Sequence, residues 1–163
     1  MLVLDLDRFK AVNDTHGHLA GDRVLAAVAG ALRAEVRDRD LVGRFGGEEF
    51  VVLLAGPVAA AVELEAVAER IRSRVAGLRV EIPTPDGPLS VAGLTVSIGV
   101  AVAPAEGADL RTLLQIADTA LYAAKRAGRN IVRVGTPPAA EHPVAARRGG
   151  EHPAEPGWIV DGE

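Results

Sequence analysis

The chain has 163 residues, of which 48% are hydrophobic, and its formal net charge at pH 7 is −4. This length suffices for one domain with a hydrophobic core, and the negative charge argues against nucleic-acid binding through bulk charge. Neither a run of about 18 apolar residues nor a charged-then-apolar signal segment occurs, so we expect no membrane segment. The lack of cysteine excludes disulfides and thiolate metal sites and is typical of a cytoplasmic location.

The first elements in chain order are a buried strand, a brief helix and a long helix. Residues 1–6 are apolar except for Asp5, whose carboxylate needs a partner such as a metal ion, a helix N-terminus or a lysine. A polar loop is expected at residues 14–22. An amphipathic helix then runs from about residue 22 to residue 37, with Asp22 in the typical role of an N-cap.

Residues 41–54 are expected to form a β-hairpin around the adjacent glycines Gly46 and Gly47. Glycines reach positive φ angles at no steric cost, and they leave the backbone open to a bulky ligand. The carboxylates of Glu48 and Glu49 follow the turn directly, and such a pair suits a hard cation that holds phosphate oxygens. A solvated hairpin tip is the alternative interpretation of this segment.

The remaining elements are a helix at 58–75, a small hairpin at 78–91, a core strand at 94–102 with Gly99 as a candidate β-bulge, a helix at 109–127 and a strand at 130–134. Residues 136–163 contain five of the ten prolines and show no apolar periodicity. We therefore expect one domain at residues 1–135, followed by a disordered Pro/Gly-rich tail.

This order of elements, β-α-β-β-α-β-α-β with a minor hairpin before the fourth core strand, predicts an α+β fold. We expect a mixed, mainly antiparallel sheet with helices packed on its faces, in a ferredoxin-like arrangement. The first strand and the central hairpin then lie side by side, which lets Asp5 meet Glu48 and Glu49 at one edge of the sheet. Such an arrangement resembles a polymerase palm, where carboxylates of neighbouring strands hold two Mg²⁺ ions.

The segment Gly46-Gly47-Glu48-Glu49-Phe50 matches the GGDEF/GGEEF signature of diguanylate cyclases. The resemblance spans residues 1–134 and includes motifs at residues 5–10, 13–14, 17–18, 21–22, 97–101, 117–125 and 128–130, in the order of the family. Such enzymes condense two GTP into cyclic di-GMP and release two pyrophosphates. The resemblance therefore implies a nucleotidyltransferase that acts as a homodimer and is inhibited by its product.

The resemblance also implies roles for individual residues. Asp5, Glu48 and the Leu6 carbonyl look like ligands of two Mg²⁺ or Mn²⁺ ions, and ligation by oxygen alone suits these metals. Glu49 would support the metal or a proton transfer, so that Asp5, Glu48 and Glu49 form the catalytic set. The residues that would bind GTP are Phe9, Lys10, Asn13, Asp22, Gly46, Gly47, Lys125 and Arg129.

Two groups within this set would recognise different parts of GTP. Asn13 and Asp22 would read guanine, because a carboxylate accepts hydrogen bonds from N1–H and N2–H₂, which adenine does not present. Lys10, Lys125 and Arg129 would hold the triphosphate. Of the 18 lysine and arginine residues only two are lysines, and both fall on these positions. A compact ammonium suits phosphate.

Arg37-x-x-Asp40 has the spacing of the family's inhibitory product site. Arg37 would grip cyclic di-GMP there, and Arg70 on the next helix resembles a secondary arginine of that site. An ordinary salt bridge among the charged residues 37–40 at the helix end is the alternative.

The family domain begins with a helix before its first strand, whereas Met1 lies within that strand. We therefore expect a domain without its first helix and without the N-terminal sensor domain that usually brings two subunits together. The chemistry residues are complete, but we expect weak or no activity of this chain alone. Two alternatives stay open: a non-catalytic regulatory domain that binds cyclic di-GMP or GTP, and a palm-type enzyme acting on another nucleotide.

Overall fold

The computed structural model describes residues 1–55, 61–85, 87–103 and 109–136. Its elements are β1 (Leu2–Leu6), α1 (Phe9–His16), α2 (His18–Glu35), β2 (Leu41–Gly46), β3 (Glu49–Leu53), α3 (Ala61–Ala76), β4 (Val80–Ile82), β5 (Leu89–Val91), β6 (Val96–Val100), α4 (Leu110–Arg126) and β7 (Val132–Val134). The expected tail lies outside the described residues, apart from Thr136. Among the described helices, none combines the length and the hydropathy needed to cross a membrane.

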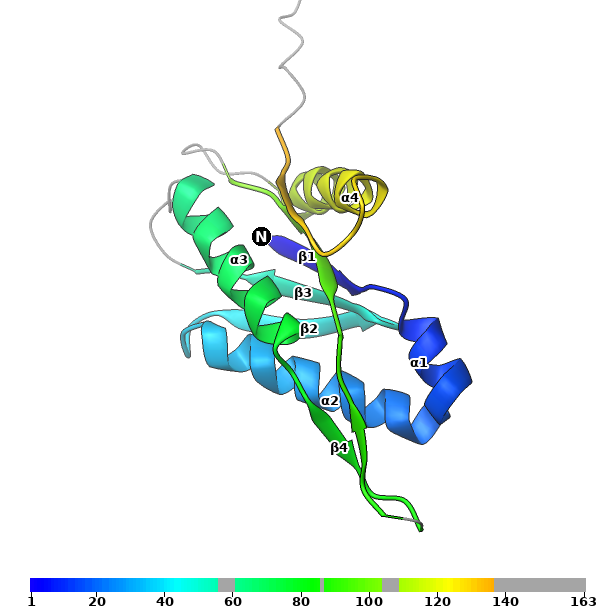
Figure 1. The fold of residues 1–163 in the computed structure, drawn as a ribbon. Coiled ribbons are helices and arrows are strands. Elements are labelled where there is room, and N and C mark those ends of the chain that lie inside the picture. Colours follow the sequence, from blue (N-terminus) through cyan, green and yellow to red (C-terminus); the bar gives the residue numbers. More distant parts are fainter. Residues whose placement is uncertain (56–60, 86, 104–108, 137–163) are drawn as a thin grey trace, which may run out of the picture.

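Five strands form one mixed sheet in the order β2-β3-β1-β6-β7 (Figure 1). The central strand β1 pairs antiparallel with both β3 and β6, and β7 joins β6 in parallel. β4 and β5 form a separate two-stranded hairpin. The α+β class, the mainly antiparallel sheet and the pairing of the first strand with the central hairpin are confirmed.

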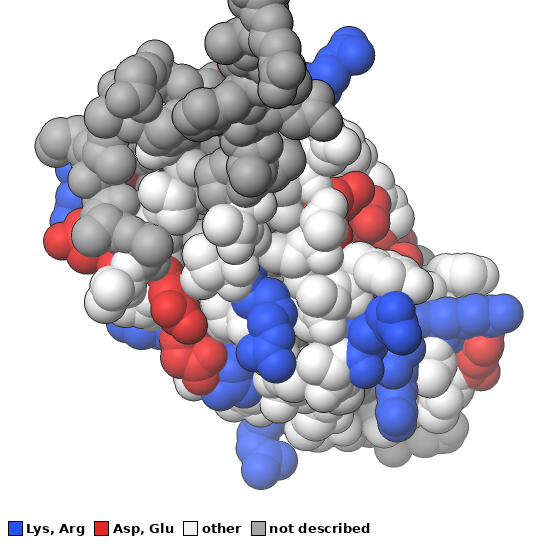
Figure 2. Space-filling view, turned by 90° about the horizontal axis from the view of Figure 1, so that it is seen from above, with Lys and Arg blue, Asp and Glu red and all other residues white. Residues whose placement is uncertain are grey.

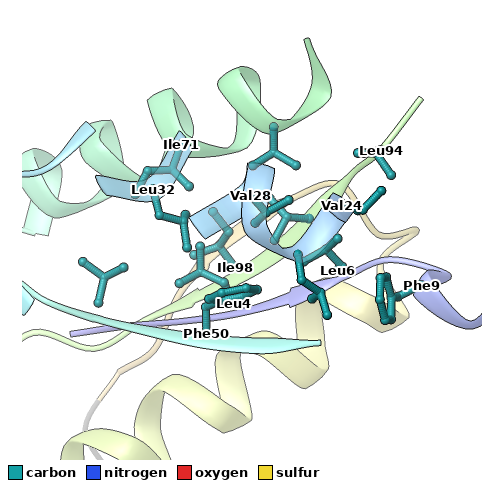
Figure 3. Packing of buried hydrophobic residues seen from close by; sticks show 14 of the residues in the cluster. Leu4, Leu6, Phe9, Val24, Val28, Leu32, Phe50, Ile71, Leu94 and Ile98 are labelled. Carbon is teal, nitrogen blue, oxygen red and sulfur yellow. The ribbon is translucent and has the colours of Figure 1, made fainter. Parts of the chain in front are cut away.

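Alternation along β1 divides its side chains between two helical layers, because successive residues of a strand point to opposite faces. The three leucines of β1 are at most 2% exposed and belong to the main core with α2 and α3 (Figure 3). Met1 and Val3 belong to the smaller core with Ala117 and Leu121 of α4. Asp5 points to the same face of the sheet as Met1 and Val3, so its carboxylate lies on the face that α4 covers.

The expectation of a polar loop at residues 14–22 is wrong. α1 continues to His16, Gly17 turns the chain with a φ of 82°, and α2 begins at once at His18. Asp22 therefore lies inside α2 and is not its N-cap, a place that Gly17 takes without a side-chain hydrogen bond. The second glycine of this segment, Gly21, serves helix packing and not chain reversal.

Gly99 is not a β-bulge, because β6 keeps an unbroken register with β1 and β7. A Cβ atom at Gly99 would collide with the carbonyl oxygen of Ala117 and lie 2.5 Å from the backbone nitrogen of Leu121. The missing side chain therefore lets α4 approach the sheet. A register shift is found instead between Arg44 and Gly46 on β2.

Candidate functional site

The candidate site lies where β1 ends beside the central hairpin. Asp5 is 7% exposed and stands directly opposite Glu49 in the pairing of β1 with β3. Glu48 lies in the hairpin turn, and its carbonyl oxygen accepts a hydrogen bond of 3.3 Å from the Leu6 N–H. The structure therefore brings the backbones of all four predicted metal and catalytic positions to one place.

Lys125 is the cation that compensates the buried carboxylate of Asp5. Its Nζ lies 2.7 Å from Oδ2 of Asp5, and the two side chains are 34% and 10% exposed. Lys125 lies in the last turn of α4, so this ion pair fastens the end of that helix to β1. Of the three kinds of partner that the sequence left open, the lysine is the one found here.

The residues at this place fit Mg²⁺ or Mn²⁺. The candidate ligands are the carboxylates of Asp5 and Glu48 and the carbonyl of Leu6, which are hard oxygen donors. Within the described ranges, no three His, Asp or Glu side chains converge on one point. Mg²⁺ typically binds through one or two carboxylates together with substrate phosphates, so a dedicated cage is not needed. The ammonium on Asp5 shows that this carboxylate accepts a cation.

The glycine turn is open to a ligand. A Cβ atom added at Gly46 or Gly47 would meet no described atom within 4 Å, and both glycines are exposed. Gly47 has a φ of 49°, a conformation that side chains rarely adopt, and its carbonyl accepts a 2.8 Å hydrogen bond from Arg44 Nε. The turn is therefore fixed in shape and bare, next to Glu48.

Helix packing brings Asn13, one of the two predicted guanine-binding residues, against α2, the helix that carries the other. A Cβ atom at Gly21 would collide with Asn13 Oδ1 and lie 3.0 Å from the ring of Phe9, so α2 touches α1 at this point. Asp22 follows Gly21 directly and is exposed, whereas Phe9 is buried in the main core. Lys10 is exposed on α1. The proximity of Asn13 to α2 thus depends on the absence of a side chain at Gly21.

Asp7 is a residue to which the sequence pattern assigns no role, although its carboxylate accepts three hydrogen bonds. The donors are Thr95 Oγ1 at 2.8 Å, Ser97 Oγ at 2.7 Å and the Asn130 N–H at 2.9 Å. These contacts join the end of β1, the start of β6 and the turn between α4 and β7, which contains Arg129. The structure therefore holds the backbone of this predicted phosphate-binding residue close to the end of β1.

The predicted inhibitory residues Arg37, Asp40 and Arg70 all line one cleft of about 710 Å³. The cleft lies between α2, α3 and the end of β3, and Met1 at the start of β1 also lines it. It therefore adjoins the start of β1, whereas the carboxylates of the candidate site lie at its end. The two predicted sites are separate places on the molecule.

Within this cleft, Asp40 already has partners of its own. Its side chain is buried and accepts hydrogen bonds from the Arg37 N–H at 2.8 Å and the Ala55 N–H at 2.9 Å. Arg70 pairs with Glu35, with 3.1 Å between Nε and Oε2. Among residues 37–40 the structure contains no guanidinium–carboxylate pair, so the helix-end salt bridge is wrong. Asp40 instead shapes the backbone that carries the exposed Arg37.

Charged side chains do not form a continuous stripe on the described part of the surface that Figure 2 shows. Lysine and arginine side chains stand in separate groups there, with uncharged surface between them and acidic groups beside them. A ligand on this side of the molecule would therefore meet local cations and not an extended basic surface.

Residues 1–131 match the family described as diguanylate cyclase, GGDEF domain. The chain belongs to this family. The sequence of this GGDEF domain is 44% identical over 137 residues to that of diguanylate cyclase DgcP from Pseudomonas aeruginosa. It is 42% identical over 134 residues to that of diguanylate cyclase DosC from Escherichia coli K12. Each alignment covers 82% of this chain, but only 19% of DgcP and 28% of DosC. The chain thus spans less than a third of the length of these relatives.

Solved structures show the same GGDEF fold. The GGDEF domain of TpbB from Pseudomonas aeruginosa aligns with a TM-score of 0.72 and 38% identity, over 83% of this chain and 80% of that chain. The coiled coil and GGDEF domain of DgcB from Caulobacter crescentus, in complex with c-di-GMP, aligns with a TM-score of 0.74 and 32% identity, over 82% and 68%. The predicted family and palm-like fold are therefore confirmed.

Proposed function

We propose that this GGDEF domain is a diguanylate cyclase, which condenses two GTP into cyclic di-GMP and two pyrophosphates by nucleotidyl transfer. The observation that carries the proposal is the pairing of Asp5 with Glu49, beside Glu48 and an open glycine turn. The relatives DgcP and DosC, named diguanylate cyclases, support it. The reaction joins two nucleotides, so two copies of the domain would each present one GTP, in the cytoplasm where GTP is available.

Asp5, Glu48 and the Leu6 carbonyl would hold two Mg²⁺ or Mn²⁺ ions. When bound, such ions neutralise charge that develops on the phosphate oxygens and favour ionisation of an attacking hydroxyl. Glu49 stands opposite Asp5 and would accept the proton of the ribose hydroxyl. Lys125 would exchange its contact with Asp5 for one with the triphosphate.

The other side chains would bind and orient GTP. Asn13 and Asp22 would bind guanine; the contact of α1 with α2 at Gly21, the residue before Asp22, supports this. Lys10 and Arg129 would neutralise the triphosphate together with Lys125. Alignment of the two reactants by such contacts removes much of the entropic part of the barrier.

A non-catalytic domain that binds cyclic di-GMP is the second candidate function. The observation that favours it is the shared cleft of Arg37, Asp40 and Arg70. In the cyclase this cleft would serve product inhibition. Arg37 would contact the ligand with its exposed guanidinium. Asp40 would hold the backbone around Arg37 by accepting hydrogen bonds from the N–H groups of Arg37 and Ala55.

A turnover assay tests the proposal. The purified chain, alone and fused to a dimerising segment, is incubated with GTP and Mg²⁺, and the products are identified by mass spectrometry. We expect cyclic di-GMP in amounts that fall to background with Glu48→Ala. A folded protein that makes no product in either form, yet binds cyclic di-GMP through Arg37, would establish the second candidate instead.

A further inference from the structure

The turn between α4 and β7 has an unusual backbone. Gly128, Arg129 and Asn130 have φ angles of 118°, 64° and 49°, so three successive residues are left-handed. Glycine adopts this conformation freely and asparagine tolerates it, but the side chain of Arg129 disfavours it. Such residues persist only where the surrounding structure holds them, and they gather at functional sites. The contacts that hold this turn therefore matter for whatever Arg129 does.

Three hydrogen bonds fix the turn from different elements. The Arg129 N–H donates to the Ala124 carbonyl at 3.2 Å, which closes the C-terminus of α4. The Asn130 N–H donates to Asp7 Oδ2 at 2.9 Å. The Asn130 side-chain oxygen accepts a bond of 2.7 Å from Arg72 Nη1, which comes from α3. Asn130 is thus held by its backbone from Asp7, directly after β1, and by its side chain from α3.

The guanidinium of Arg72 is itself held in place. Its Nε lies 2.9 Å from both Oε1 and Oε2 of Glu69, one turn earlier on α3, and its side chain is 20% exposed. A guanidinium is planar and presents its donors in a fixed fork, so the Glu69 contact determines where Nη1 points. A lysine has no such fork and would not make both contacts in the same way.

We propose that Arg72 is a positioning residue for Arg129: by holding Asn130 it fixes the turn in the conformation that presents Arg129 to the triphosphate of GTP. This inference rests on the proposed function, in which Arg129 binds phosphate. Arg72 acts through Asn130 and does not touch the nucleotide. Asp7 holds the same residue through its backbone N–H, and the Asp7 carboxylate is itself fixed by the hydroxyls of Thr95 and Ser97.

A double-mutant cycle separates positioning from simple stabilisation of the fold. The probe is α,β-methylene GTP with Mg²⁺, which cannot react, and its binding to the full chain is measured by calorimetry. We expect Arg129→Ala and Arg72→Met each to weaken binding by about tenfold, the usual scale for a lost hydrogen bond to a charged group. In the double variant Arg72→Met should cause no further loss, because Arg129 is already gone.

Arg74→Met is the matched control. Arg74 lies on the same helix and pairs with Glu35 at 3.0 Å, but it does not contact the turn. This variant should bind the probe like the wild type, and circular dichroism should show all variants folded. If Arg72→Met fails to fold, Asn130→Gly replaces it in the cycle, because glycine adopts the left-handed backbone without strain, removes the acceptor of Arg72 and keeps the N–H that donates to Asp7.

Each outcome decides between the explanations. A loss of affinity for Arg72→Met that disappears in the Arg129→Ala background supports the inference. Wild-type affinity for Arg72→Met, or an equal loss in both backgrounds, overturns it and leaves the proposed function intact. If the wild-type chain does not bind the GTP analogue at all, the proposed function fails as well.

Discussion

The ion pair between Lys125 and Asp5 leads to a sharp prediction about stability. Lys125→Met keeps the length and the apolar stem of the side chain but removes the charge. The Asp5 carboxylate then stays buried, with its side chain 10% exposed, and has lost the ammonium 2.7 Å away. We expect the variant to be less stable than the wild type in the absence of divalent metal.

The size of the effect follows from burial. Removing one partner of a fully buried ion pair costs about 3–5 kcal/mol. Lys125 is one-third exposed, so water reaches the pair from that side and screens part of the interaction. We therefore expect a loss of about 1–3 kcal/mol, the range for leaving a buried polar group without its partner.

Urea unfolding followed by circular dichroism, with and without Mg²⁺, measures this loss. Mg²⁺ should stabilise Lys125→Met more than the wild type, because in the variant no lysine competes for the carboxylate. As a control, Asp5→Asn combined with Lys125→Met should recover most of the lost stability. Equal stability of Lys125→Met and the wild type, or an equal effect of Mg²⁺ on both, would refute this reasoning.

Three further predictions concern other parts of the domain. Gly99→Ala should cost about 1–3 kcal/mol in urea unfolding, because its Cβ enters the backbone of α4. Arg37→Ala should abolish calorimetric binding of cyclic di-GMP at unchanged stability, whereas Asp40→Ala should lower both; equal stability losses would contradict this. The hydrogen bond from Arg72 lowers the pKa of Glu69 below its ordinary value. The contribution of this contact to stability is therefore complete above the ordinary pKa of a glutamate and is lost as the pH falls through the lowered pKa. Glu69→Gln should remove this part of the acid sensitivity, and an unchanged stability–pH profile would refute it.

The regular elements of the sheet were predictable because their patterns are local. The apolar run of β1 and the apolar runs on both sides of Gly46 and Gly47 indicate strands without knowledge of the rest of the chain. The prediction for residues 14–22 was wrong because glycine has two uses. Gly17 turns the chain, but Gly21 lies inside a helix and makes room for Asn13. A single sequence does not distinguish a glycine chosen for φ from one chosen for its size.

The polar contacts of the candidate site were not predictable, because they join residues that lie far apart in the chain. The hydrogen bond from Asn130 to Asp7 spans 123 positions, and that from Arg72 to Asn130 spans 58. No spacing rule reaches across such distances. The carboxylate of Asp5 was different: its need for a partner was evident from its apolar strand, although the choice of Lys125 was not.

The most direct test of the central claim is a crystal structure with Mn²⁺ and α,β-methylene GTP, in which anomalous scattering locates the metal. We expect Mn²⁺ within coordination distance of Asp5, the Leu6 carbonyl and Glu48, with guanine between Asn13 and Asp22. Metal bound elsewhere, or nucleotide found only in the cleft of Arg37 and Arg70, would contradict it.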